Sequence, residues 1–175
     1  MTSVVLSIGS NLGDRMAHLQ SVLDGLGDAV TAVSPVYETP AWGGVEQGAF
    51  LNAVVLAEDA SRGPHDWLRR ANELEASAQR VREQHWGPRT LDVDLVEVRD
   101  GEREITVADD TLTLPHPYAH VRAFVLLPWL AVAPSATLTV QGRPVPVHDL
   151  LADLDPAERA GLHRTDSALV PRSGR

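Results

Sequence analysis

The chain has 175 residues, of which 43% are hydrophobic, which is enough for one compact domain and too few for two full ones. It contains no cysteine, which excludes disulfides, thiolate zinc sites and a cysteine nucleophile. The formal net charge of -9 argues against binding to nucleic acid, which needs a basic surface. No segment approaches the roughly 18 apolar residues of a membrane span and no leader pattern precedes the first strand, so we expect a cytoplasmic protein without membrane contacts.

The first half of the chain predicts strands that alternate with helices. Residues 4–8 predict a strand, and after a turn at 9–11 the apolar residues recur at helical spacing as far as Leu26. A β-branched run over 30–37 predicts a second strand, and the proline and glycines of 39–44 predict a loop. Residues 50–56 predict a third strand, before a helix over 67–78 whose start Asp66 can cap.

The second half continues this pattern after a polar loop over 79–90. Residues 91–96 alternate strictly and predict a strand, 99–102 carry a hairpin signal, and 119–132 predict a helix that Pro128 bends or ends. A last short helix is expected within 145–154. Together the elements predict an α+β sandwich with helices on a mainly antiparallel sheet. We expect a single domain over 1–160 and a flexible C-terminal tail over 161–175.

Two carboxylates stand on the strand predicted over 91–96. Side chains alternate along a strand, so Asp92 and Asp94 project from the face opposite to Leu91, Val93 and Leu95, with attachment points roughly 6.6 Å apart. This spacing suits two hard cations about 3.5 to 4 Å from each other, and magnesium completes its shell with water and phosphate oxygens. Two solvated acids on an exposed strand are the alternative, and for a bare Asp-X-Asp pattern they are the commoner one.

Positive charge gathers just before the acidic strand. Arg80, Arg82 and Arg89 fall within ten positions, a cluster typical of a polyphosphate site, although a solvated basic loop is the alternative. All 15 basic residues are arginine, so a single arginine is weak evidence for a ligand. Trp86 lies on a Gly-Pro turn, where its indole either stacks on a ligand such as a purine or packs into the core.

Further candidates are aromatic or lie beside proline. His116 stands between two prolines that fix its direction, and Arg122 offers a cation beside the ring of Phe124. Phe50 and Asn52 share one face of a strand that follows a loop containing Trp42, an arrangement that suits a flat heterocycle. A structural histidine and core phenylalanines are the alternatives.

In this order, the segments closely resemble the 6-hydroxymethyl-7,8-dihydropterin pyrophosphokinase family of folate biosynthesis, from about Val4 to Pro134. The most specific of them is Trp-Gly-Pro-Arg-Thr-Leu-Asp-Val-Asp at 86–94. The others are Ser-Ile-Gly-Ser-Asn-Leu-Gly at 7–13, Val-Tyr-Glu-Thr-Pro at 36–40, Gln-Gly-Ala-Phe-Leu-Asn at 47–52, Arg-Val-Arg at 80–82, Leu-Thr-Leu-Pro-His-Pro at 112–117 and Arg-Ala-Phe-Val-Leu-Leu-Pro at 122–128.

The resemblance implies a ferredoxin-like three-layer αβα sandwich that transfers the terminal diphosphate of ATP to the pterin hydroxymethyl oxygen and releases AMP. It implies that Asp92 and Asp94 bind two Mg²⁺ ions. It assigns catalytic, phosphate-binding roles to Arg80, Arg82 and Arg89. Residues that match the family's nucleotide site are Glu75, Trp86, Leu95, Thr113, His116 and Arg122. Residues that match its pterin site are Thr39, Pro40, Trp42, Phe50, Asn52 and Phe124.

Three positions depart from the pattern of some family members. His85 and Thr111 replace arginines, and Pro117 replaces a tyrosine, so the corresponding nucleotide contacts differ. Two other classes remain open: a non-enzymatic module that binds a ring between Phe50 and Phe124, and a two-metal phosphohydrolase built on the same acid pair. For the enzyme we expect a monomer that acts on ATP and the pterin.

Overall fold

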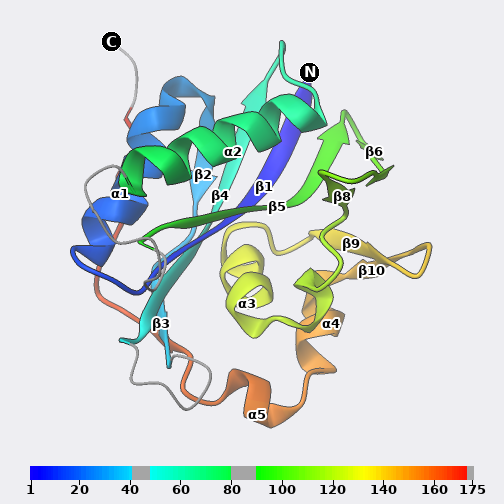
Figure 1. Cartoon of the computed structure of the whole chain (residues 1–175). Coiled ribbons are helices and arrows are strands. Elements are labelled where there is room, and N and C mark those ends of the chain that lie inside the picture. The colour runs from blue at the N-terminus through cyan, green and yellow to red at the C-terminus, as the bar shows by residue number, and fades with distance from the viewer. Residues whose placement is uncertain (41–47, 80–89, 173–175) are drawn as a thin grey trace.

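The computed structural model describes residues 1–40, 48–79 and 90–172, and an antiparallel sheet forms its centre (Figure 1). β1 (Thr2–Ser10) pairs on one side with β4 (Phe50–Asp59) and on the other with β5 (Asp92–Asp100). β2 (Val30–Val33) and β3 (Tyr37–Thr39) both pair with β4, β6 (Arg103–Glu104) pairs with β5, and β11 (His163–Arg164) pairs with β3. The predicted mainly antiparallel sheet is confirmed.

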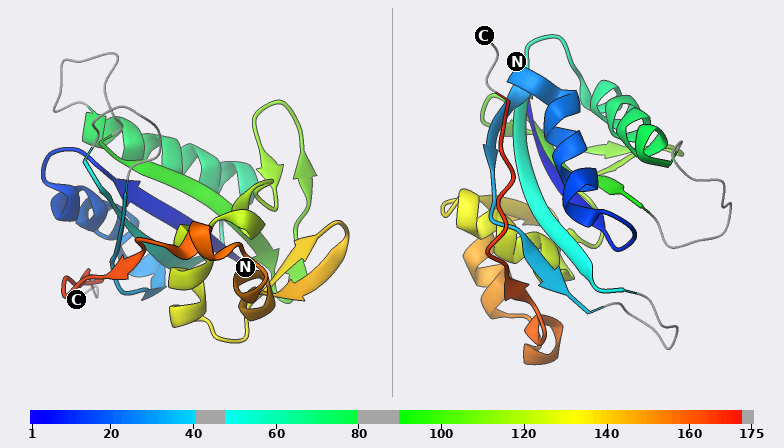
Figure 2. Two further views of the ribbon diagram at one scale, coloured as in Figure 1. Left: turned by 90° about the horizontal axis from the view of Figure 1, so that it is seen from below. Right: turned by 90° about the vertical axis from the view of Figure 1, so that its left-hand side faces the viewer.

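Helices cover both faces of this sheet, which gives three layers (Figures 1 and 2). α1 (Arg15–Leu26) and α2 (Pro64–Gln79) pack on one face, where Leu6 and Ile8 of β1 are buried. α3 (Ala123–Val132) and α4 (Val147–Ala152) pack on the other, where Val5 and Val54 are buried. The alternation of side chains along β1 and β4 therefore produces two apolar cores. The predicted α+β class is confirmed, and none of the described helices has the length and hydrophobicity to cross a bilayer.

Short elements complete the described chain. A ribbon of β7 (Val107–Ala108) and β8 (Thr113–Leu114) follows the main sheet, and a second ribbon pairs β9 (Thr137–Val140) with β10 (Arg143–Pro146). η1 (Gly27–Ala29) and η2 (Ala119–Val121) are 3₁₀ turns, and α5 (Pro156–Arg159) is a single helical turn.

Several element boundaries differ from the sequence-based prediction. The strand predicted over 30–37 is split into β2 and β3, since Ser34 there donates its backbone N–H to the Val54 carbonyl (2.9 Å) and receives the Val54 N–H on its hydroxyl (2.9 Å). The helix predicted over 119–132 is η2 followed by α3, and Pro128 lies buried inside α3 without ending it. The short helix predicted within 145–154 is present as α4, but it is followed by a further helical turn, α5, that was not predicted.

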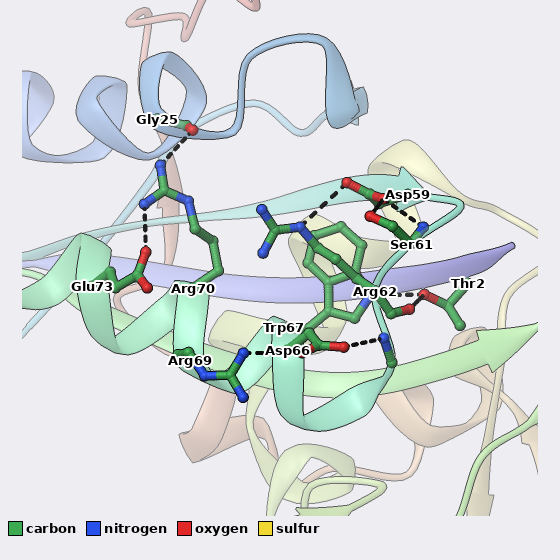
Figure 3. A network of polar contacts seen from close by, with 11 residues as sticks. Thr2, Gly25, Asp59, Ser61, Arg62, Asp66, Trp67, Arg69, Arg70 and Glu73 are labelled. Carbon is green, nitrogen blue, oxygen red and sulfur yellow. Dashed lines mark hydrogen bonds and ion pairs between the residues drawn. The ribbon is translucent and has the colours of Figure 1, made fainter.

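A polar network fixes the start of α2 against the sheet and α1 (Figure 3). Trp67 is buried and its indole N–H donates to the Thr2 hydroxyl (2.9 Å), while the Arg62 guanidinium lies 5.5 Å from the Trp67 ring centre. The sequence predicted that Asp66 caps the start of α2. Asp66 lies within the first turn of the helix rather than before it, and its carboxylate accepts the Gly63 N–H (2.8 Å). Arg70 donates to the Gly25 carbonyl (2.6 Å) and so connects α2 to α1.

The C-terminal segment packs against the body of the protein, which differs from the flexible tail predicted over 161–175. Thr165 donates its N–H to the Val36 carbonyl (2.8 Å), and Gln20 exchanges two hydrogen bonds with Val170. Leu169 is 5% exposed and belongs to the core beneath α1 and α2. β11 pairs with the side of β3 that faces away from β4, and Leu169 adds apolar contact. Together these interactions outweigh the polar composition of residues 161–172.

Replacing Leu169 measures how firmly this segment is held. We expect Leu169→Ala to lower the free energy of unfolding by about 2 to 4 kcal/mol, as for other buried leucines. Val170→Ala is the matched control, because Val170 is 65% exposed, and we expect a change within about 0.5 kcal/mol. Urea unfolding measures both, and equal effects would mean that Leu169 is not buried in solution.

Candidate active site

A cavity of about 1160 Å³ opens on the face of the sheet that α3 covers. The sheet contributes side chains from its three central strands: Ser7 and Gly9 from β1, Asn52 from β4, and Asp92 and Asp94 from β5. The surrounding walls come from the end of β3, from the segment entering α3, and from the stretch around α5. Their lining residues include Thr39, Pro40, Phe50, Tyr118, Arg122, Phe124, Glu158 and Leu162.

The two carboxylates lie where the strand prediction placed them. Asp92 is the antiparallel partner of Gly9, and Asp94 is the partner of Ser7, so all four residues share one face of the sheet. Both acids are half-buried. Glycine and serine stand opposite the acids. A Cβ added at Gly9 would lie 3.1 Å from the Asn52 Oδ1, so the Asn52 amide would have to shift by a few tenths of an ångström to accommodate it.

The donor set of the acid pair fits magnesium. Among the described residues no group of three or more His, Cys, Asp or Glu side chains could hold a metal ion. A structural zinc site would need about four protein ligands. Magnesium is held by one or two carboxylates and takes its remaining oxygens from water and substrate phosphates. Asp92 and Asp94, in a cavity large enough for phosphates, meet that requirement.

Asn52 is fixed at the opposite side of Gly9 from the acids. It is 4% exposed, and its amide N–H donates to the Thr39 hydroxyl (3.0 Å). Thr39 in turn pairs with Phe50 across β3 and β4. The amide, the hydroxyl and the Phe50 ring therefore lie together along one wall of the cavity, next to Pro40.

Arg122 lies between two aromatic rings. Its guanidinium carbon is 5.7 Å from the Tyr118 ring centre and 5.6 Å from the Phe124 ring centre. No acidic side chain in the described part of the chain forms an ion pair with it. Cation–π contacts orient a guanidinium without neutralising it, so its charge stays available to an anion in the cavity.

The half-buried position of His116 favours the neutral form of its imidazole. Burial lowers the pKa of the imidazole; Asp94 opposes this shift and Arg122 adds to it. The ring accepts the Tyr118 N–H at Nδ1 (3.1 Å), so the proton of the neutral ring belongs on Nε2. The sequence identified His116 but missed Tyr118, which contacts both His116 and Arg122. The available signal was an aromatic residue directly after Pro-His-Pro.

A second cavity of about 470 Å³ lies along the outer edge of β5. Its lining brings together Glu75 and Asn72 of α2, Leu95 of β5, Thr113 of β8, and His116. Glu75 accepts the Val93 N–H (3.2 Å) and so connects α2 to the strand of the acids. Asp94 lines both cavities, which makes it the residue common to them.

All but five of the candidate residues line one of the two cavities. Thr111 and Pro117, two of the departures from the family pattern, also line the smaller cavity. The remaining candidates lie outside the described residues, and so does the third departure, His85. These candidates are Trp42, Arg80, Arg82, Trp86 and Arg89.

A half-buried acid pair and a ring-oriented arginine in one cavity are groups that enzymes of the phosphate-transfer class use. The sequence model of the 7,8-dihydro-6-hydroxymethylpterin-pyrophosphokinase (HPPK) family matches residues 5–134. The chain belongs to this family.

Relatives of known identity agree with this assignment. The chain is 60% identical over 164 residues to the 2-amino-4-hydroxy-6-hydroxymethyldihydropteridine pyrophosphokinase of Mycobacterium tuberculosis (strain ATCC 25618 / H37Rv), covering 91% of this chain and 87% of the relative. It is 58% identical over 175 residues to the enzyme of the same name in Mycobacterium leprae, covering 97% and 92%.

A solved structure supports the fold alone. Wild-type Plasmodium falciparum HPPK-DHPS with pteroate superposes with a TM-score of 0.67 at 13% identity. The match covers 98% of this chain and 49% of that one, so the chain spans about half the length of that protein.

Removing the Tyr118 ring tests its contact with Arg122. Since an exposed cation–π contact contributes about 0.5 to 1 kcal/mol, we expect Tyr118→Leu to lower kcat/KM for ATP by about two- to fivefold. Tyr118→Phe keeps the ring and should stay within about twofold of the wild type. Steady-state kinetics with varied ATP measures both, and equal losses in the two variants would show that the ring does not position Arg122.

Proposed function

We propose that this chain transfers the terminal diphosphate of ATP to the hydroxymethyl oxygen of 6-hydroxymethyl-7,8-dihydropterin, giving AMP and the pterin diphosphate in folate biosynthesis. Family membership and the 58–60% identical pyrophosphokinases support this reaction. The observation that carries it is the position of Asp94, which lines both cavities, because the two substrates of a transfer reaction must meet at one point.

The two cavities suggest one orientation of the substrates. The nucleotide would occupy the smaller cavity, beside Glu75, Leu95, Thr113 and His116, and its phosphates would point toward Asp94 and Arg122. The pterin would occupy the larger cavity, where Phe50 and Phe124 supply two rings and the Asn52 amide can bond a lactam edge. Thr39 and Pro40 would border this pterin site. Trp86 would join the nucleotide, and Trp42 would join the pterin loop.

Asp92 and Asp94 are the proposed ligands of two Mg²⁺ ions, with ATP completing their coordination. When bound, magnesium supplies charge neutralisation of the phosphates. Arg122 adds a cation at the same place, and Arg80, Arg82 and Arg89 are proposed to hold the transferred phosphates. The proton on Nε2 gives neutral His116 a hydrogen-bond donor on the nucleotide side. Positioning of the substrates and neutralisation of phosphate charge therefore supply most of the rate acceleration, without a protein nucleophile.

The proposed enzyme is a monomer that acts on two small molecules, with neither nucleic acid nor a membrane as partner. A phosphohydrolase with the same acid pair would release phosphate from ATP without the pterin, and a binding module would not turn over ATP at all. Purified protein with ATP and Mg²⁺ should therefore form AMP only when 6-hydroxymethyl-7,8-dihydropterin is added, as measured by nucleotide chromatography. Formation of AMP without the pterin would contradict the proposal.

Asp94→Asn removes one metal ligand with little change of shape. We expect kcat to fall by at least about a hundredfold and the Mg²⁺ concentration for half-maximal rate to rise. Cooperative unfolding should persist, since the half-buried side chain lines both cavities. Asp100→Asn is the matched control at the far end of the same strand, where Asp100 is exposed, and it should keep wild-type kinetics. Wild-type rates in Asp94→Asn would remove it from the metal site.

A further inference from the structure

Residues 160–170, which we call the strap, pass from one face of the sheet to the other around the edge at β3 (Figure 2, right). At the start of the strap, Leu162 packs against the core beneath α3, and near its end Leu169 is buried in the core beneath α1 and α2. Between them β11 pairs with β3, His163 opposite Glu38 and Arg164 opposite Tyr37. The strap lies outside residues 5–134, which the family model matches.

Gly161 of the strap lies against Pro40 of the candidate pterin site. Gly161 has φ +82°, and a Cβ added to it would lie 2.8 Å from Cγ and 3.0 Å from Cδ of Pro40. The strap backbone therefore lies directly against the proline ring. Ala160 and Leu162 on either side of Gly161 line the same cavity as Pro40.

Contacts continue from Pro40 toward the sheet. Thr39 pairs with Phe50, and its hydroxyl accepts the Asn52 amide N–H. The strap thus supports the outer side of a series of residues, from Pro40 through Thr39 to Asn52, that all line the cavity. A backbone held by a strand pairing and a buried leucine moves less than a free loop, so it can fix the position of the residues it contacts.

We infer that the strap is a positioning element for the pterin site, and that Gly161 acts by allowing its backbone to support Pro40. This inference rests on the proposed function, which assigns Thr39, Pro40 and Asn52 to the pterin. A larger residue at 161 would push Pro40 and Thr39 toward the cavity and weaken pterin binding. The nucleotide, beside the outer edge of β5, would not be affected.

Gly161→Ala tests this role against a matched control. Gly142, in the turn between β9 and β10, has φ +77° and no atom within 4 Å of an added Cβ. Gly142→Ala therefore places alanine at a similar positive φ without a contact. We expect Gly161→Ala to raise KM for the pterin about tenfold, with KM for ATP and kcat within about twofold of the wild type. Gly142→Ala should keep all three constants, and equal pterin KM values in the two variants would overturn the inference.

A double-mutant cycle separates the contact from a general loss of structure. Pro40→Ala removes the Cγ and Cδ atoms that the new methyl group would meet, so Gly161→Ala should raise the pterin KM by less than about twofold in that background. The same double variant serves if Gly161→Ala alone does not unfold cooperatively. An additive effect on KM would overturn the inference. Absence of pterin-dependent AMP with the wild type would instead contradict the proposed function.

Discussion

The pairing of β1 with β4 on one side and β5 on the other fixes the relative positions of the cavity residues that the sheet contributes. Gly9 is the partner of both Asn52 and Asp92, and Ser7 is the partner of Asp94. Since side chains alternate along a strand, a slip of one residue would move each of these groups to the opposite face, beneath α1 and α2. The register is held by the two cores, because Leu6 and Ile8 on one face of β1 and Val5 on the other are buried.

The charged side chains on this face of the sheet differ in sign and in what holds them. The protein carries a formal net charge of -9, so an anionic substrate is attracted only where positive charge is local. Aromatic rings rather than acids hold Arg122, so no carboxylate of the described residues offsets its charge through an ion pair. Asp92 and Asp94 contribute negative charge, which repels phosphates. They favour phosphate binding only when divalent cations lie between the carboxylates and the phosphates. Carboxylates and an uncompensated guanidinium in one cavity therefore suit a metal–nucleotide complex better than either part alone.

Local pattern predicted the elements whose side chains alternate or recur over several turns. The strand of the acids and the face on which they stand were predicted from 91–96 alone, because strict alternation leaves one arrangement. Contacts between distant segments were not predictable in this way. The β9–β10 ribbon was missed, and the pairing of β11 with β3 joins residues more than 120 positions apart, so no short window carries the signal. Tyr118 was missed because its partner Arg122 becomes its neighbour only through the 3₁₀ turn η2.

The path of the C-terminal segment also decides where an attached protein would emerge. Val170 is held by Gln20 of α1, so the chain leaves the described structure beside that helix, near the upper left of Figure 1. The larger cavity opens on the opposite face of the sheet, which α3 covers. A fusion partner or affinity label joined after residue 172 would therefore start beside α1, on the face of the sheet opposite to the larger cavity. A label joined within 160–170 would disturb the sheet edge itself.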